Sequence, residues 1–227
     1  MEVYLASAAG LLSWCGKWRK IPTPLAHPTL LAACGADVAL ADSVNRLLYR
    51  QGRVSTLPPG VEVLRCWRNQ LLTLSSETNC LTLYDAHDYP LVTSPAGIRP
   101  CDCAIVDCQV IVCGCLHIFS LPDLREIAAY PVPGCPMRVA ADGRVLTCLS
   151  LLSPDPPQTL LFRLCLTSGD FAPVALLPGW CGAVTIADDH TIWAGVGEQL
   201  LHFPLDSVVP DVQFGGFGLI RFLSCQQ

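Results

Sequence analysis

Short apolar runs of roughly four to eight residues follow one another along the chain, and each ends at glycine, proline, asparagine or aspartate. Runs of this length between turn residues are typical of β-strands. No segment keeps the 3.6-residue spacing of apolar positions that an amphipathic helix requires. The pattern therefore predicts an all-β chain with little helix.

One order of elements recurs: a connector with proline or glycine, an apolar strand, a tight turn and three further strands. Residues 131–153, PVPGCPMRVAADGRVLTCLSLLS, show it most clearly, with the tight turn at Asp142–Gly143. The first strand of each repeat is expected to begin at Thr29, Val61, Cys101, Met137, Gly182 and Phe217. Self-similarity at a period of roughly 20–50 residues is typical of solenoids and propellers.

The last repeat supplies a single strand, and residues 1–28 supply the three strands that it lacks. Four-stranded blades around a common axis are the architecture of a β-propeller. We therefore expect one domain over residues 1–227, a six-bladed β-propeller closed by a blade that the two termini share. The expected blades are 217–227 with 1–28, 29–60, 61–100, 101–136, 137–181 and 182–216. If residues 1–28 form a capping extension instead, the propeller has five blades.

The composition agrees with sheets that are buried on both faces. The chain is 52% hydrophobic and 15% charged, against a usual charged share of about 25%. Blades that stack face to face need continuous apolar strands. The segments LAACGADVALA and CAIVDCQVIVCGC also hold the small residues that inner strands would need.

The phrases AGIRPCDCAIVDCQVIV, VPGCPMRVAADGRVL and LPGWCGAVTIADDHTI carry a resemblance. Their order of Gly-x-x-Pro, apolar strand, Asp-Gly turn and apolar strand resembles lactonase-type, NHL-type and WD-repeat propellers. The resemblance extends over the whole chain at the level of fold. The Trp-Asp dipeptide of WD repeats is absent, so the resemblance implies an architecture without selecting one of these families.

Charge and hydropathy exclude some classes of partner. A net charge of −5 argues against nucleic acid, which requires a concentrated basic face. The longest apolar stretch, 3–16, is shorter than the ~20 residues of a membrane-spanning helix. The N-terminal MEVY carries an acid where a secretory signal has positive charge. Neither a nucleic-acid nor a membrane partner is expected.

Many of the fourteen cysteines occupy positions where valine or alanine would fit. Free cysteine behaves as a small buried hydrophobe, and this pattern predicts a reduced, cytoplasmic chain. The densest group is Cys101, Cys103, Cys108, Cys113 and Cys115. Its Cys-x-Cys spacing places two sulfur atoms on one face of a strand, so a Zn²⁺ site is the alternative to core packing.

The resemblance to six-bladed lactonases implies a second alternative, a metal in the central channel. No cofactor is expected, but Ca²⁺ or Zn²⁺ would be the alternative, held by Glu62, Asp102 and Asp107. An acid between packed blades is costly unless it is paired. The same three carboxylates can instead meet Arg65, Arg138 or Arg221.

The connector from the fourth strand of one blade to the first strand of the next (the four-to-one connector) lies at one end of the strands. The turn between the second and third strands (the two-three turn) lies at the same end, and propellers bind ligands there. The candidate binding residues there are His27, Asn45, Glu77, Arg99, Trp180 and Phe217. No sequence motif of a hydrolase, phosphate loop or dinucleotide site occurs. We therefore expect a non-catalytic binding or scaffold module with a protein or peptide partner. The alternatives are a lactonase or hydrolase with the axial metal, and a secreted carbohydrate-binding propeller with disulfides and ring-facing aromatic residues.

Overall fold

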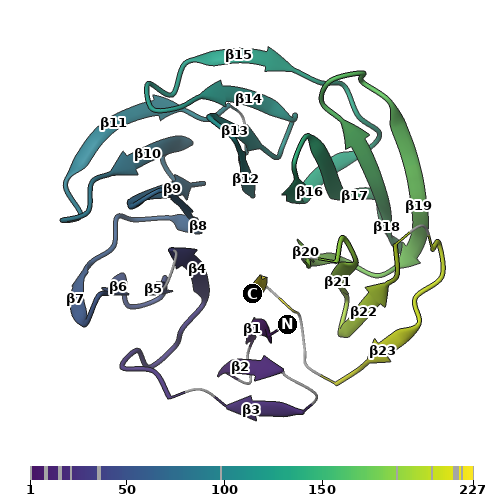
Figure 1. Ribbon diagram of the computed structural model, residues 1–227, viewed down its shortest axis with the longest axis horizontal. Helices are drawn as coiled ribbons and strands as arrows, with labels where there is room; N and C mark the ends of the chain where they lie inside the picture. Colours follow the sequence, from purple (N-terminus) through teal and green to yellow (C-terminus); the bar gives the residue numbers. More distant parts are fainter. Residues whose placement is uncertain are drawn as a thin grey trace. The chain divides into compact units, whose positions relative to one another are not determined.

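The protein consists of β-strands joined by turns and connectors (Figure 1). The computed structural model describes residues 2–7, 10–14, 17–20, 22–34, 37–97, 99–187, 189–205, 207–216, 220 and 222–226. These residues form six four-stranded antiparallel sheets. None of the described residues belongs to a helix long and apolar enough to cross a membrane. The chain divides into two compact units, Pro22–Pro131 and Met1–Ile21 with Val132–Gln227.

The unit Pro22–Pro131 contains three sheets, each made from one continuous segment. The first sheet is β4 (Leu30–Cys34), β5 (Asp37–Asp42), β6 (Leu47–Arg50) and β7 (Arg53–Thr56). The second is β8 (Val61–Trp67), β9 (Gln70–Ser75), β10 (Cys80–Tyr84) and β11 (Pro90–Pro95). The third is β12 (Cys103–Val106), β13 (Gln109–Val112), β14 (His117–Ser120) and β15 (Glu126–Ala129). In each sheet the strands are paired in chain order, so each is a blade of the kind that the repeat predicts.

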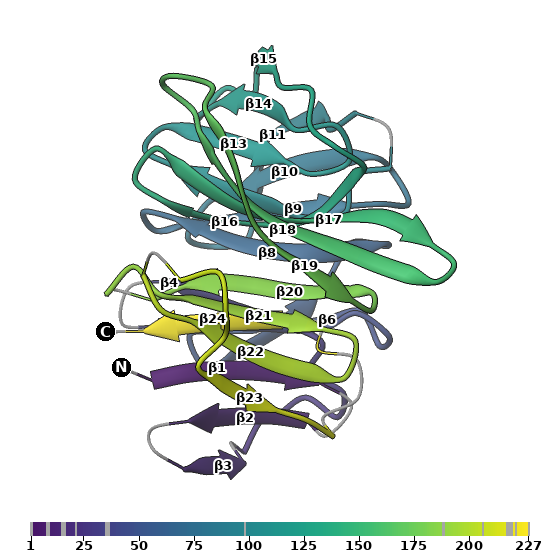
Figure 2. The same cartoon turned by 90° about the vertical axis from the view of Figure 1, so that its right-hand side faces the viewer.

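The other unit contains two further continuous sheets and one composite sheet. The first continuous sheet is β16 (Cys135–Asp142), β17 (Val145–Pro154), β18 (Pro157–Cys165) and β19 (Phe171–Pro178). The second is β20 (Cys181–Ile186), β21 (Ile192–Val196), β22 (Gln199–Phe203) and β23 (Val212–Phe214). The composite sheet pairs β24 (Phe222–Gln226) with β1 (Glu2–Ser7), which continues into β2 (Gly10–Trp14) and β3 (Trp18–Lys20). Figure 2 shows β24 beside β1.

The predicted six-bladed count is corrected by this arrangement. Five blades are continuous four-stranded segments, as the repeat requires, whereas the sheet at the termini is assembled from two distant segments. The sequence pattern already assigned this sheet to both ends of the chain, but it counted the sheet as a sixth blade, because apolar runs give the number of strands and not the equivalence of the sheets. We therefore describe five continuous blades and one composite terminal sheet.

The hydrophobic core lies between neighbouring sheets. Leu74 and Leu83 of the second blade pack with Val112 and Phe119 of the third in one buried cluster. Other buried clusters join the first blade to the second and the β16–β19 blade to the β20–β23 blade. Sheets buried on both faces explain the apolar runs and the low share of charged residues.

Small residues on the first two strands allow segments to approach closely. A Cβ atom at Gly182 of β20 would lie 2.5 Å from the carbonyl oxygen of Ile220, which lies two positions before the start of β24. Real Cβ atoms do not approach an oxygen so closely, so alanine does not fit here without a shift of the backbone. The close packing of Ile220 against Gly182 therefore gives a physical reason for the small residues expected on these strands.

Candidate functional site

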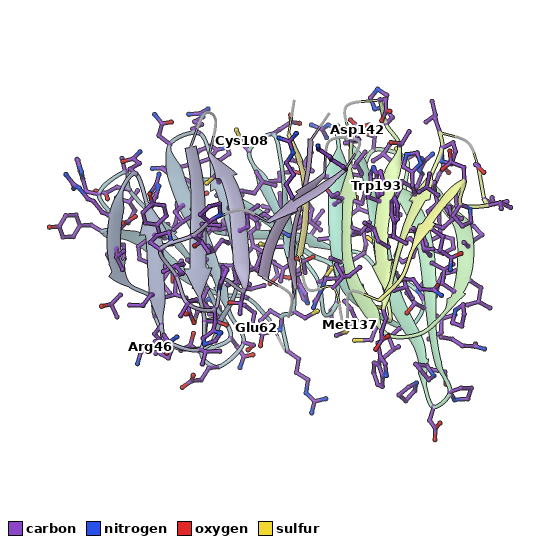
Figure 3. All side chains as sticks on the ribbon, turned by 90° about the horizontal axis from the view of Figure 1, so that it is seen from below. Arg46, Glu62, Cys108, Met137, Asp142 and Trp193 are labelled. Carbon is purple, nitrogen blue, oxygen red and sulfur yellow. The ribbon has the colours of Figure 1, made fainter. Side chains whose placement is uncertain are left out.

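Each blade has two ends, which differ in the loops that they carry. We call the end with the two-three turns and the four-to-one connectors the connector side, and the end with the one-two and three-four turns the turn side. Within the unit Pro22–Pro131, Figure 3 shows Arg46 and Glu62 at the connector side and Cys108 at the turn side. The predicted residues His27, Asn45, Glu77 and Arg99 all belong to loops of the connector side, and all four are exposed.

The loops that carry His27 and Asn45 are tied together by Asp42, which the sequence reasoning did not single out. The Asp42 carboxylate is fully buried and accepts hydrogen bonds from the backbone N–H of His27 at 3.1 Å and of Asn45 at 2.9 Å. The side-chain amide of Asn45 donates a third hydrogen bond, at 2.7 Å. An aspartate directly before a turn is a known turn-forming signal, and this signal was the available clue.

These hydrogen bonds make the stability of the loops depend on pH. Burial disfavours the charged form of Asp42, but the donors on Asn45 and His27 favour it more strongly, and the pKa of Asp42 is lowered from its usual 3.8. A carboxyl group with a lowered pKa contributes stability that is complete above about pH 4 and is lost as the pH falls through the folded-state pKa.

We expect Asp42→Asn to lower the free energy of unfolding by about 2 kcal/mol at neutral pH, because the amide cannot accept all three hydrogen bonds. The deficit should shrink as the pH falls below 3.8, because the unfolded wild-type chain then binds a proton at this carboxyl that the folded chain, with its lowered pKa, binds only at a still lower pH. Urea denaturation at the two pH values measures this difference. Asp123→Asn, at an exposed carboxylate on another loop, is the control. A deficit that is equal at both pH values would contradict the role given to Asp42.

The turn that carries Glu77 rests directly on the preceding connector. Gly60 has a φ of +64°, and a Cβ atom added there would lie 2.2 Å from the Cβ of Glu77. The backbone N–H of Ser76 donates to the Gly60 carbonyl at 3.0 Å, and the Ser75 hydroxyl donates to the Pro59 carbonyl at 3.0 Å. The backbone of Glu77 is therefore fixed while its side chain points into solvent.

Two further exposed residues complete the connector side of this unit. Arg99 follows β11 with a φ of 52°, and Val44, in the turn beside Asn45, is 73% exposed. The neighbouring Arg46 donates from Nε to the Leu57 carbonyl at 3.3 Å. The connector side thus presents an apolar side chain among charged and amide groups on hydrogen-bonded loops.

The remaining two binding candidates belong to the other unit. Trp180 lies between β19 and β20, is 49% exposed, and its carbonyl accepts a hydrogen bond from the Gly197 N–H at 2.9 Å. Phe217 lies outside the described residues. The structure therefore gathers four of the six candidates within one unit and places Trp180 on a separate one.

The three carboxylates of the metal alternative do not form one group. Asp102 is buried and pairs with Arg65 at 2.6 Å, as the sequence allowed. Glu62, on β8, accepts a hydrogen bond from the Ser76 hydroxyl. Asp107 is exposed in the one-two turn after β12, at the opposite end of that strand from Asp102. Among the described residues, no three or more His, Cys, Asp or Glu side chains are grouped so that they can hold a metal ion.

The cysteines of the Zn²⁺ alternative are similarly spread. Cys103 and Cys113 are buried, whereas Cys108 and Cys115 are exposed in turns at opposite ends of β13. Ten cysteines of the described part of the chain are free thiols. Cys66 is disulfide-bonded, so the prediction of a fully reduced chain is wrong at this residue. The cytoplasmic location stays a prediction.

Burial and exposure predict how the thiols react. Burial raises the pKa of the Cys103 thiol to about 12, and only the thiolate is a nucleophile. Iodoacetamide at mildly alkaline pH should therefore alkylate the exposed Cys108, Cys115 and Cys135 long before Cys103. Mass spectrometry of digests taken over time measures the order. Alkylation of Cys103 at the rate of the exposed thiols would show that the β12 strand is not packed as described.

Comparison with known proteins supports the fold. A chain in the crystal structure of a nidogen/laminin complex matches 98% of this chain and 97% of its own length, with a TM-score of 0.78 at 11% identity. Hydrazine synthase from Kuenenia stuttgartiensis matches with a TM-score of 0.62 at 11% identity, over 86% of this chain and 60% of its own. BamB from Moraxella catarrhalis matches with a TM-score of 0.56 at 12% identity, over 93% and 69%.

These structural matches show that the chain is a β-propeller repeat protein at the level of fold. No family model matches the sequence. A search of the curated proteins gave no match either. Since one propeller fold carries many unrelated functions, the fold alone does not identify an activity.

Proposed function

We propose that the protein is a non-catalytic binding module, and that a protein or peptide partner docks on the connector side of the unit Pro22–Pro131. The observation that carries the proposal is the contrast between backbone and side chains there. Asp42, Ser75 and the Gly60 carbonyl hold the loops by hydrogen bonds, while the side chains of Val44, Glu77 and Arg99 are exposed. Loops that are already ordered lose little entropy on binding.

The chemistry of the connector side suits a polypeptide partner. Arg99 and Arg46 provide donors for carboxylates and carbonyl groups, Glu77 provides an acceptor, and the exposed Val44 provides apolar contact. Mixed polar and apolar surfaces of this kind are typical of protein interfaces. The similar fold in a nidogen/laminin complex is a precedent for a propeller-like chain within a protein assembly.

A library of displayed peptides selected on the full chain tests the proposal. The double variant Arg99→Glu with Glu77→Lys exchanges charges on the connector side and keeps the net charge. Its matched control is Arg53→Glu with Glu126→Lys, which makes the same exchange at exposed residues elsewhere in the same unit. We expect the connector-side variant to weaken binding of the selected peptides by about tenfold or more, and the control to change it little.

Two outcomes would contradict the proposal. One is that selection enriches no peptide for the wild-type chain over an unrelated propeller. The other is that the control variant weakens binding as much as the connector-side variant does. Circular dichroism and urea denaturation of both variants separate lost binding from lost folding.

A further inference from the structure

The turn side of the unit Pro22–Pro131 contains an open surface pocket, called the cavity below, that is separate from the connector side. Its volume is about 370 Å³, which lies within the range of about 300–1,000 Å³ for ligand pockets. The β8–β9, β12–β13 and β14–β15 segments each contribute to it. The lining residues are Trp67, Arg68, Gln70, Cys108, Leu121 and Pro122. Figure 3 shows Cys108 at this end of the unit.

The indole of Trp67 is held in place from two directions. Its Nε1 donates to the Asp107 carbonyl at 3.0 Å, which ties the end of β8 to the turn after β12. The Arg68 guanidinium lies over the indole, 4.5 Å from the ring centroid, at a distance typical of cation–π contacts. One wall of the cavity is therefore an ordered aromatic ring with a cation on its face.

A second part of the lining is apolar. Leu121 is buried, Pro122 follows it, and the Leu121 backbone N–H donates to the Cys108 carbonyl at 2.8 Å. This hydrogen bond joins the β14–β15 turn to the β12–β13 turn. Both apolar residues are thereby fixed relative to Cys108.

The polar groups of the cavity are few and carry positive charge. Arg68 is exposed, and within the described part of the chain no carboxylate lies within ion-pair distance of its guanidinium. Gln70 adds an amide, and Cys108 adds an exposed thiol. A guanidinium binds a carboxylate through two parallel N–H groups, and its flat face also stacks on aromatic rings.

We propose that this cavity binds a small aromatic carboxylate. The ring of the ligand lies against the indole edge and the Leu121–Pro122 surface, and its carboxylate accepts hydrogen bonds from the Arg68 guanidinium. A volume equal to roughly twelve water molecules at ~30 Å³ each accommodates one substituted ring. Because the site lies at the other end of the blades, its occupancy does not depend on a partner at the connector side.

The first test uses 4-fluorophenylacetate and its neutral analogue 4-fluorophenylacetamide as probes of the full chain. Titration followed by ¹⁹F NMR measures both affinities at neutral pH. We expect saturable binding of the acid with a Kd on the order of 1 mM. The amide, which lacks the charge that Arg68 recognises, should bind about tenfold more weakly.

Arg68→Met tests the role of the guanidinium, since methionine keeps a flexible apolar chain over the indole. The variant should bind the acid about tenfold more weakly and leave the affinity for the amide unchanged. Arg53→Met, at an exposed arginine that does not line the cavity, is the matched control and should bind both probes as the wild type does.

Protection of Cys108 gives a second readout that does not depend on the NMR signal. Saturating 4-fluorophenylacetate should slow the alkylation of Cys108 by iodoacetamide several-fold. Cys115 is equally exposed but does not line the cavity, and its rate should stay unchanged. Equal affinities for acid and amide, an Arg68→Met variant that binds like the wild type, or unchanged alkylation of Cys108 would each overturn the proposal.

Discussion

Replacing Gly60 with alanine is expected to lower the free energy of unfolding by about 3 kcal/mol or more. Two costs add at this position. The backbone φ of +64° is one that residues with a side chain adopt reluctantly. The new Cβ atom would also lie 2.2 Å from the Cβ of Glu77 and 2.9 Å from its backbone nitrogen. Backbone atoms cannot move aside cheaply, so the connector and the β9–β10 turn must separate.

Gly52→Ala is the control that isolates the second cost. Gly52 has a φ of +75°, and a Cβ atom there would meet no atom within 4 Å. This variant should therefore lose only the conformational preference of glycine, about 1 kcal/mol. Urea denaturation of both variants measures the difference. Equal losses at the two glycines would show that the β9–β10 turn does not rest on Gly60.

Replacing Arg65 with methionine is expected to lower the free energy of unfolding by about 3–5 kcal/mol. Arg65 lies on the first strand of its blade, and its guanidinium reaches the next one. Its Nε donates to the Cys103 carbonyl at 2.6 Å and its Nη2 to the Asp102 carboxylate at 2.6 Å. The variant leaves the buried Asp102 without this cation, and a buried charge deprived of its partner is strongly destabilising.

Arg138 provides an internal comparison. It occupies the like position on β16, and its Nε donates to the Gly182 carbonyl at 2.6 Å on the next blade. Arg138→Met should cost about 1–3 kcal/mol, because it removes the hydrogen bonds that the guanidinium donates to the Gly182 and Met137 carbonyls. Arg53→Met, at an exposed residue, should cost less than about 0.5 kcal/mol. A loss at Arg65 no greater than that at Arg53 would contradict the proposed link between the two blades.

The strands were predictable because turn residues separate them so regularly. β8 begins at Val61, as expected, while β12 begins at Cys103 and β16 at Cys135, each two residues from the expected start. The number of equivalent blades was not predictable in the same way. Counting apolar runs gives strands and indicated that one sheet combines two distant segments, but it does not show whether that sheet is equivalent to the five continuous blades.

The site was predictable only in part. Exposure of His27, Asn45, Glu77 and Arg99 followed from their places in connectors and turns. The buried Asp42 was missed, because its burial depends on residues near His27 folding back over the end of β5. The cavity beside Arg68 was not predicted either, because its lining residues come from turns that are far apart in the sequence.

The pairing of β1 with β24 has a consequence for synthesis on the ribosome. Leu5 lies opposite Leu223, so the hydrogen bonds along this edge of β1 can form only after β24, a strand far later in the sequence, has been synthesised. Until then β1 is an open edge, and open edges invite pairing with other nascent chains. Closure of this sheet is therefore a late step in folding, and slow translation lengthens the interval in which the edge of β1 stays open.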